Sequence, residues 1–333
     1  MNPRPAERCQ QSLARWRSAL EADLLARRAA VPGRRPHLRR RKGRIAVVTD
    51  SSSSLPVDRG TQEVLLGPVG ANIISVPIPV MIGDQIYPET SPDLDRDLPM
   101  ALAVGSPVRT SRPSPGRLMQ AYQALQSQGY AGVVSIHLSA KLSGTVEAAR
   151  LAAGQLDFPV TVIDSGQAGL GLGHAVIDAA ITAQLGGSSA SVAEAATRSA
   201  EQAESLFVLP NLDQLRRGGR INAMSTLIGG LLWVKPLLQL VEGEIHPVER
   251  PRTMPRALER LQDRVAQQAH GMTAPRLAVH GFGNQAQALE LAEALGPLSA
   301  SPIPVVDLPP VLAAHLGLGA LAVSLNPELP GTR

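Results

Sequence analysis

The sequence has 333 residues, of which 44% are hydrophobic and 18% are charged. It can therefore bury a sizeable core and is not disordered as a whole. Its one cysteine, Cys9, excludes an internal disulfide framework and a multi-cysteine metal site. No uncharged stretch is long enough for a membrane-spanning helix, and residues 1–44 contain no apolar segment typical of a secretory signal. We therefore expect a cytoplasmic protein.

Charge is distributed unevenly along the chain. Residues 1–44 carry 13 Lys and Arg against three acidic residues, a net charge of +10, whereas the other 289 residues carry a net charge of −6. We expect residues 1–43 to be a basic extension, either disordered or partly helical, with helical spacing of apolar residues over 11–28. A basic extension suits nucleic acid or an anionic membrane surface, and equally a solvated tail. Trp16 is isolated, so nothing indicates stacking on bases.

The first half of the remaining chain alternates strands and helices. The predicted strands are 45–50, 73–82, 132–138 and 160–164, and the predicted helices are 115–128, 145–153 and 172–184. Pro77 and Pro79 indicate that the second strand is irregular or lies at an edge. This order predicts a doubly wound parallel sheet in an α/β domain over residues 44–187.

The second half has a different pattern, and a glycine-rich seam at 186–189 precedes it. The predicted helices are 192–203, 212–217, 254–269 and 286–295, and the predicted strands are 206–209, 237–241, 245–248, 276–280 and 303–306. Glu242-Gly243-Glu244 between two of these strands is typical of a hairpin. We expect an α+β domain over residues 188–325 and a tail over 326–333.

Several familiar motifs are absent or incomplete. Gly169-Leu170-Gly171-Leu172-Gly173 resembles a dinucleotide loop, but His174 stands where the third required glycine belongs. The sequence has no phosphate-binding loop of the nucleotide-hydrolase type and no nucleophile elbow. Its seven histidines show no pairing at helical spacing, so we expect neither a cofactor nor a metal site.

Polar turns at strand ends are the remaining candidates for a site. Residues 110–114 precede a predicted helix, residues 139–145 join a strand to a helix, and Asp164-Ser165 follows another strand. Ligands of open α/β sheets bind at the carboxyl ends of strands, and helix N-termini attract anions. Ser and Thr at helix starts also serve as ordinary caps, so spacing alone leaves both interpretations open.

Taken together, nine segments resemble the DegV family of bacterial fatty-acid-binding proteins, which includes acyl carriers of fatty acid kinase. They occur in order from about residue 44 to 325, and residues 1–43 lie outside the resemblance. The segments are IAVVTDS at 45–51, TSRPS at 110–114, LSAKLSGT at 138–145, VIDS at 162–165, LDQLRRGGRI at 212–221, LLWVKP at 231–236, GEIHP at 243–247, RT at 252–253 and AHLG at 314–317.

The resemblance implies two α/β domains, the second with a mainly antiparallel sheet, and a fatty acid in an aliphatic tunnel between them. It implies that the carboxylate is held by Thr110, Ser111 and Ser143, by the backbone N–H groups of Gly144 and Thr145, and by His315 near one end of the tunnel. An aliphatic block near the Gly-Gly-Arg turn is the candidate tunnel wall, with ordinary core as the alternative: Ile228, Leu231, Leu232, Leu237 and Leu238.

Four positions depart from the family pattern. Arg112 replaces a common glutamine, Ala140 replaces a common serine, and Leu318 and Ala320 make the segment after His315 more apolar than in many relatives. These departures affect the carboxylate geometry and the chain preference.

The predicted function is a non-catalytic carrier that binds a long-chain fatty acid and presents its carboxylate to a fatty acid kinase. Polar groups that bind, without a positioned nucleophile and base, suit a carrier better than an enzyme. One alternative is an acyl-substrate hydrolase that uses Ser143 or Ser111 with His315. A second is nucleic-acid binding through the basic extension, although we expect no nucleic acid partner.

Arg216, Arg217 and Arg220 suggest an exposed basic patch for a kinase or a membrane surface, or simply a solvated turn.

Overall fold

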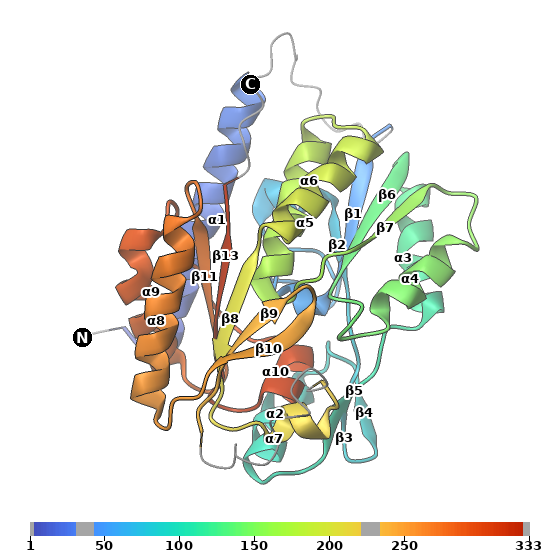
Figure 1. Ribbon diagram of the computed structural model, residues 1–333. Coiled ribbons are helices and arrows are strands. Elements are labelled where there is room, and N and C mark those ends of the chain that lie inside the picture. Colours follow the sequence, from blue (N-terminus) through green and yellow to red (C-terminus); the bar gives the residue numbers. More distant parts are fainter. Residues whose placement is uncertain (1–2, 31–42, 221–233, 329–333) are drawn as a thin grey trace.

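The computed structural model describes residues 3–30, 43–220 and 234–328 (Figure 1). Its architecture is α/β and confirms the predicted fold class, with one parallel sheet in the first half of the chain and one mainly antiparallel sheet in the second. Within the described residues, no helix combines the length and apolar character needed to cross a membrane.

The parallel sheet has four strands in the order β2-β1-β6-β7. Its strands are β1 (Ile45–Asp50), β2 (Ile73–Val76), β6 (Gly132–His137) and β7 (Val160–Asp164). Every residue of β1 and β6 is buried, as expected for central strands covered on both faces. Helices α3 (Pro115–Ser127) and α4 (Thr145–Ala153) cover one face, while α5 (Gly169–Gln184) and α6 (Ser189–Glu201) pack as a pair on the other.

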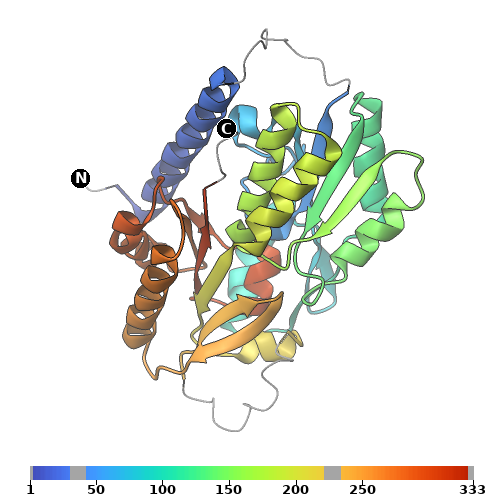
Figure 2. The same cartoon turned by 45° about the horizontal axis from the view of Figure 1, so that its top comes forward.

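The second sheet has six strands in the order β10-β9-β8-β13-β11-β12. Its strands are β8 (Glu204–Val208), β9 (Leu237–Val241), β10 (Glu244–Glu249), β11 (Arg276–Gly281), β12 (Val305–Asp307) and β13 (Leu321–Asn326). All neighbours are antiparallel except β11 and β12. Helices α8 (Met254–His270) and α9 (Gln285–Leu295) bury one face of this sheet (Figure 2).

A small third sheet, in the order β4-β3-β5, lies near the edge where the site forms. It contains β3 (Val80–Ile82), β4 (Gln85–Tyr87) and β5 (Val108–Thr110), and α2 (Pro92–Ala103), α7 (Asp213–Arg217) and α10 (Pro310–Leu316) pack around it. The sequence patterns did not predict α2, β4, β5, α10 or β13. Elements as short as β4, β5 and α10, of three to seven residues, give too little periodicity to be recognised.

The predicted domain boundary after residue 187 falls between α5 and α6. Both helices pack on the parallel sheet, and β8 is the first element of the six-stranded sheet. The division into domains at this position stays a prediction.

Helix α1 (Pro5–Ala30) is longer than the predicted segment 11–28 and packs against both halves of the molecule (Figure 2). Trp16, which is 2% exposed, meets the buried ring of His174 edge-on at a centroid distance of 6.1 Å. Ser12 accepts a hydrogen bond from the backbone N–H of Val305 on β12 at 3.0 Å. Residues 5–30 therefore form part of the packed core, and Trp16 is not available to stack on a base.

Candidate functional site

A largely aliphatic cavity lies between the inner face of the six-stranded sheet and the parallel-sheet half of the chain. It encloses about 850 Å³, including the part open to solvent. Its apolar lining comprises Ile78, Leu138, Leu142, Leu215, Leu240, Ile245, Leu308, Val311, Leu312, Leu316 and Phe207, with Ala168 and Ala322. Such a wall matches an alkyl chain better than a sugar or a nucleotide.

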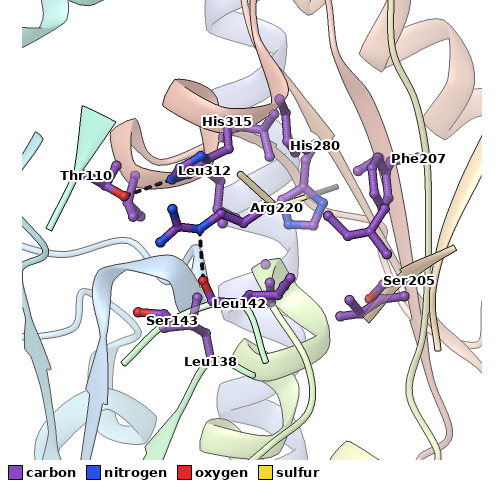
Figure 3. A pocket seen from close by; sticks show the side chains of 18 of the residues that line it. Thr110, Leu138, Leu142, Ser143, Ser205, Phe207, Arg220, His280, Leu312 and His315 are labelled. Carbon is purple, nitrogen blue, oxygen red and sulfur yellow. Dashed lines mark hydrogen bonds between the residues drawn. The ribbon is translucent and has the colours of Figure 1, made fainter. Parts of the chain in front are cut away.

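Four polar side chains gather at one side of this cavity, and we call them the head-group cluster: Thr110, Ser143, Arg220 and His315 (Figure 3). The Thr110 hydroxyl and the Nε2 atom of His315 are joined by a hydrogen bond of 2.8 Å. Thr110 ends β5 and His315 lies on α10, so elements about 200 residues apart in the chain meet here. Figure 3 shows the Arg220 guanidinium between this pair and the Leu142–Ser143 turn.

The cluster carries its charge on arginine rather than on histidine. Burial, together with repulsion from the Arg220 guanidinium, lowers the pKa of His315 to about 4. His315 is therefore neutral near pH 7. One guanidinium, a neutral imidazole and two hydroxyls form a set of groups suited to a single carboxylate.

Arg220 was assigned from the sequence to an exposed patch, and the structure corrects this. Its side chain is half-buried and lines the cavity, whereas Arg216 and Arg217 are exposed. The Nε group of Arg220 donates to the Leu142 carbonyl at 3.1 Å, which fixes the guanidinium at the turn that carries Ser143. Its sequence signals were its place in the segment 212–221 of the family resemblance and its position after a Gly-Gly turn, where Gly219 has a φ of +68°.

The other residues predicted for the carboxylate occupy different surroundings. Ser111 borders the cavity but is exposed, and its hydroxyl donates to the Arg112 carbonyl at 3.3 Å. Gly144 borders an outer groove rather than the cavity. Thr145 is fully buried and shares a 2.8 Å hydrogen bond with the Ser143 hydroxyl, so its side chain supports Ser143.

Two of the five residues predicted for the tunnel wall lie on β9, and neither lines the cavity. Leu237 packs towards α8, and Leu238 packs in the cluster that includes Leu215 and Ala314. Leu240 and Ile245 of the same hairpin line the cavity instead. The remaining three lie outside the described residues: Ile228, Leu231 and Leu232.

The outer groove connects the head-group cluster with solvent. It shares Leu142, Ser143, Arg220 and Ile245 with the cavity, and its other border residues are Ala140, Lys141, Gly144, Gly219 and Glu244. Lys141 lies at its rim, with Nζ 3.8 Å from a carboxylate oxygen of Glu244.

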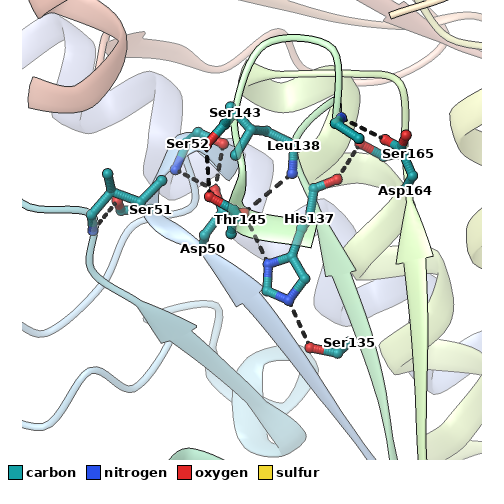
Figure 4. Close-up of polar contacts among 12 residues, drawn as sticks. Asp50, Ser51, Ser52, Ser135, His137, Leu138, Ser143, Thr145, Asp164 and Ser165 are labelled. Carbon is teal, nitrogen blue, oxygen red and sulfur yellow. Dashed lines mark hydrogen bonds and ion pairs between the residues drawn. The ribbon is translucent and has the colours of Figure 1, made fainter. Parts of the chain in front are cut away.

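A buried polar chain supports the turn that carries Ser143 (Figure 4). Asp50 accepts from the backbone N–H of Leu138 at 3.1 Å and lies 3.0 Å from Nδ1 of His137. The Nε2 atom of His137 is 2.7 Å from the Ser135 hydroxyl, which bonds to Tyr122 at 2.8 Å. This order resembles a catalytic triad, but Asp50, His137 and Ser135 are 0% exposed and border no cavity described here. Through the bond from the Leu138 N–H to Asp50, this polar chain fixes the start of the turn.

The contact required by the hydrolase alternative does not appear in the described part of the chain. Ser143 bonds to Thr145 and Ser111 bonds to the Arg112 backbone, while His315 bonds to Thr110. Neither serine is thus paired with a base, as a nucleophile requires. Over residues 3–30, 43–220 and 234–328, no group of three His, Cys, Asp or Glu side chains is placed to hold a metal ion.

Comparisons with known proteins agree with this architecture. Residues 44–328 match a family model described as "Uncharacterised protein, DegV family". A DegV domain-containing protein of Streptomyces coelicolor is 38% identical over 284 residues, which cover 85% of this chain and 98% of that protein. One from Deinococcus radiodurans is 34% identical over 286 residues, covering 85% and 98%.

Two solved structures show the same fold at useful sequence identity. The fatty-acid-binding DegV family protein of Thermus thermophilus superposes with a TM-score of 0.73 at 30% identity, covering 86% of this chain and all of that one. DegV of Bacillus subtilis, described as a fatty acid binding protein, gives a TM-score of 0.73 at 26% identity with the same coverage. From residue 44 to residue 328, this chain belongs to the DegV family.

Proposed function

We propose that this protein binds a long-chain fatty acid and presents its carboxylate to a fatty acid kinase. The observation that carries the proposal is the aliphatic cavity with one cation, one neutral imidazole and two hydroxyls gathered where it meets the outer groove. The fatty-acid-binding relatives from Thermus thermophilus and Bacillus subtilis support it. The alkyl tail lies along the aliphatic wall, and the carboxylate lies at the head-group cluster.

The energetics favour tight binding. Burial of a methylene group contributes about 0.8 kcal/mol, so about fourteen methylenes offer on the order of 11 kcal/mol before the costs of ordering the chain. A carboxylate buried without partners would lose much of this gain. The Thr110 and Ser143 hydroxyls and the Arg220 guanidinium supply those partners.

The chain itself supplies binding, and the kinase supplies the phosphoryl transfer. A carboxylate oxygen attacks the terminal phosphate of the kinase's nucleotide, and the diphosphate leaves. The carboxylate is already ionised near pH 7, so the carrier needs no general base. The exposed Arg216 and Arg217 lie close in sequence to Arg220 and offer the kinase a basic contact surface.

Binding is tested by native mass spectrometry of the purified protein and by titration with C14–C18 acids. The expected result is an added mass of a few hundred daltons. Thr110→Val combined with Ser143→Ala should weaken binding by at least tenfold, because hydrogen bonds to a charged group contribute about 1.5–3 kcal/mol each. Thr161→Val with Ser127→Ala, both on the surface, is the matched control. Unchanged affinity of the first pair would reject the head-group cluster.

Presentation to the kinase is tested separately. The loaded protein is mixed with a fatty acid kinase and ATP, and the acyl phosphate is trapped with hydroxylamine. Hydroxamate should form from the loaded wild type and fall in Arg216→Ala with Arg217→Ala, while fatty acid binding stays unchanged. A loaded carrier that gives no hydroxamate would refute presentation and leave the binding proposal standing.

A further inference from the structure

A second set of polar side chains lines the cavity on the side away from the head-group cluster. We call it the inner polar set: Ser205, His280 and Ser324. Figure 3 shows Ser205 and the His280 ring across the cavity from Thr110 and Ser143. The wall that surrounds them is largely aliphatic.

The strand register brings the three residues together. Ser205 on β8 is paired directly with Ser324 on β13, and His280 on β11 is paired with Ala322, two residues from Ser324. Directly paired side chains have Cβ atoms about 5 Å apart, and diagonal neighbours lie about 7–8 Å apart. Alternation along each strand turns all three towards the cavity, so a single polar group on a ligand can reach at least two of them.

His280 places a ring nitrogen without a close hydrogen-bond partner beside the cavity. Its ring is 1% exposed, and its Nε2 atom accepts the backbone N–H of Leu170 at 3.0 Å. Burial keeps the ring neutral by lowering its pKa to about 4, so the remaining proton is on Nδ1. The Ala322 backbone opposes this shift, and within the described residues the buried Nδ1 atom lies in no hydrogen bond.

The two serines complete the set. Ser205 donates to Oε1 of Gln167 at 3.0 Å, which leaves the oxygen lone pairs of Ser205 free to accept. Ser324 is 3% exposed, and its hydroxyl makes no hydrogen bond to any described residue. The set thus offers two donors and an acceptor to whatever occupies this part of the cavity.

A plain alkyl chain matches these groups poorly. Leaving a buried donor without a partner costs about 1–3 kcal/mol, and a hydrocarbon tail would exclude the water that otherwise satisfies it. A site with unpaired polar groups discriminates against ligands that lack the complementary group.

We infer that the inner polar set selects a fatty acid whose chain carries a second oxygen, a hydroxyl or keto group, in the part that lies beside Ser205, His280 and Ser324. The inference rests on the proposed function and adds the chemical class of the ligand. The oxygen accepts from Nδ1 of His280 and from Ser324, and a hydroxyl also donates to Ser205.

The test compares stearic acid with a series of positional hydroxystearic acids on the full chain after removal of bound lipid. One isomer should bind about five- to tenfold more tightly than stearic acid, the factor expected for about one hydrogen bond to a buried donor. Isomers with the hydroxyl elsewhere should bind more weakly than stearic acid, because they bury it among methyl groups.

Ser205→Ala with Ser324→Ala should abolish the preference and leave the affinity for stearic acid equal or higher. Ser127→Ala, on the surface, should keep the preference. The serines are chosen because replacing His280 would also remove its contact with the start of α5. The nitrogen-15 resonance of His280 Nδ1 in labelled wild type gives a second readout and should move with the preferred isomer but not with stearic acid.

The inference is overturned if every isomer binds more weakly than stearic acid by the same factor in wild type and in the serine variant. Failure of the proposed function looks different, because then stearic acid itself does not bind.

Discussion

Glu89 offers a quantitative test of how the cavity wall is held. It follows β4, and its Oε2 atom accepts the backbone N–H of Ile78 at 3.1 Å. Its Oε1 atom is buried and has no partner within the described residues, although the residue as a whole is half-buried. Ile78 and Val311 both line the cavity, and the backbone of Val311 also interacts with this carboxyl group. Glu89 therefore joins two parts of the wall that are distant in sequence.

The structure predicts the sign and size of the effect of ionising this group. Burial raises the pKa of Glu89 from 4.5 to about 7, against the opposing effect of its hydrogen bonds from Ser51 and Ile78. The native state then holds the proton more tightly than the unfolded state, so the contribution of Glu89 to stability falls as pH rises from about 4.5 to about 7. Since one pKa unit corresponds to 1.36 kcal/mol, the total change is about 3 kcal/mol.

Glu89→Gln removes this titration and keeps an oxygen that can accept from Ile78. The free energy of unfolding in urea should be measured for wild type and variant between pH 4.5 and pH 8. The difference, variant minus wild type, should increase by about 2–3 kcal/mol over that range. Taking the difference cancels the titration of the buried histidines. Glu201→Gln, on the exposed end of α6, is measured alongside as the control for a Glu-to-Gln change at the surface. A constant difference for Glu89→Gln would refute the reasoning.

Two further predictions concern α1 and the head-group cluster. Trp16→Ala should lower the free energy of unfolding by about 3–5 kcal/mol, because it leaves a cavity between α1 and the core. Leu25→Ala, on the exposed side of α1, should lower it by less than about 1 kcal/mol. Equal effects of the two variants would show that α1 does not pack as described. Gly218→Ala should weaken fatty acid binding about fivefold, because its Cβ would overlap the His315 ring at Nδ1. Gly296→Ala, with open space around its Cβ, is the control in the same titration, and equal affinities of the two glycine variants would contradict this role of Gly218.

The central strands of the parallel sheet were predictable because both of their faces are buried. The runs at 45–49 and 132–138 are mostly apolar, and the structure has β1 at 45–50 and β6 at 132–137. Helices such as α3 and α8 were predictable from their caps, since Ser114 and Thr253 each accept the backbone N–H three residues later. These signals are local, so a single sequence contains them.

The site depends on contacts that no local pattern contains. The short α10 brings His315 to Thr110, and the turn after α7 brings Arg220 to the Leu142 carbonyl. On β9, the sequence offered Leu237 and Leu238 as candidates for the wall, whereas Leu240 of the same strand lines the cavity.

By itself, the sequence determined the fold class, most of the long elements and the polar turns that end in Ser143 and Thr110, because caps, breakers and burial periodicity act over a few residues. Only the tertiary structure decided that α1 is packed rather than an arm, that Arg220 supplies the charge at the cavity, and that Ser205, His280 and Ser324 share its inner side. Those outcomes depend on strand register and on packing between distant segments. Because the side chains that bury one another there are not neighbours in the chain, no local sequence pattern contains the contact.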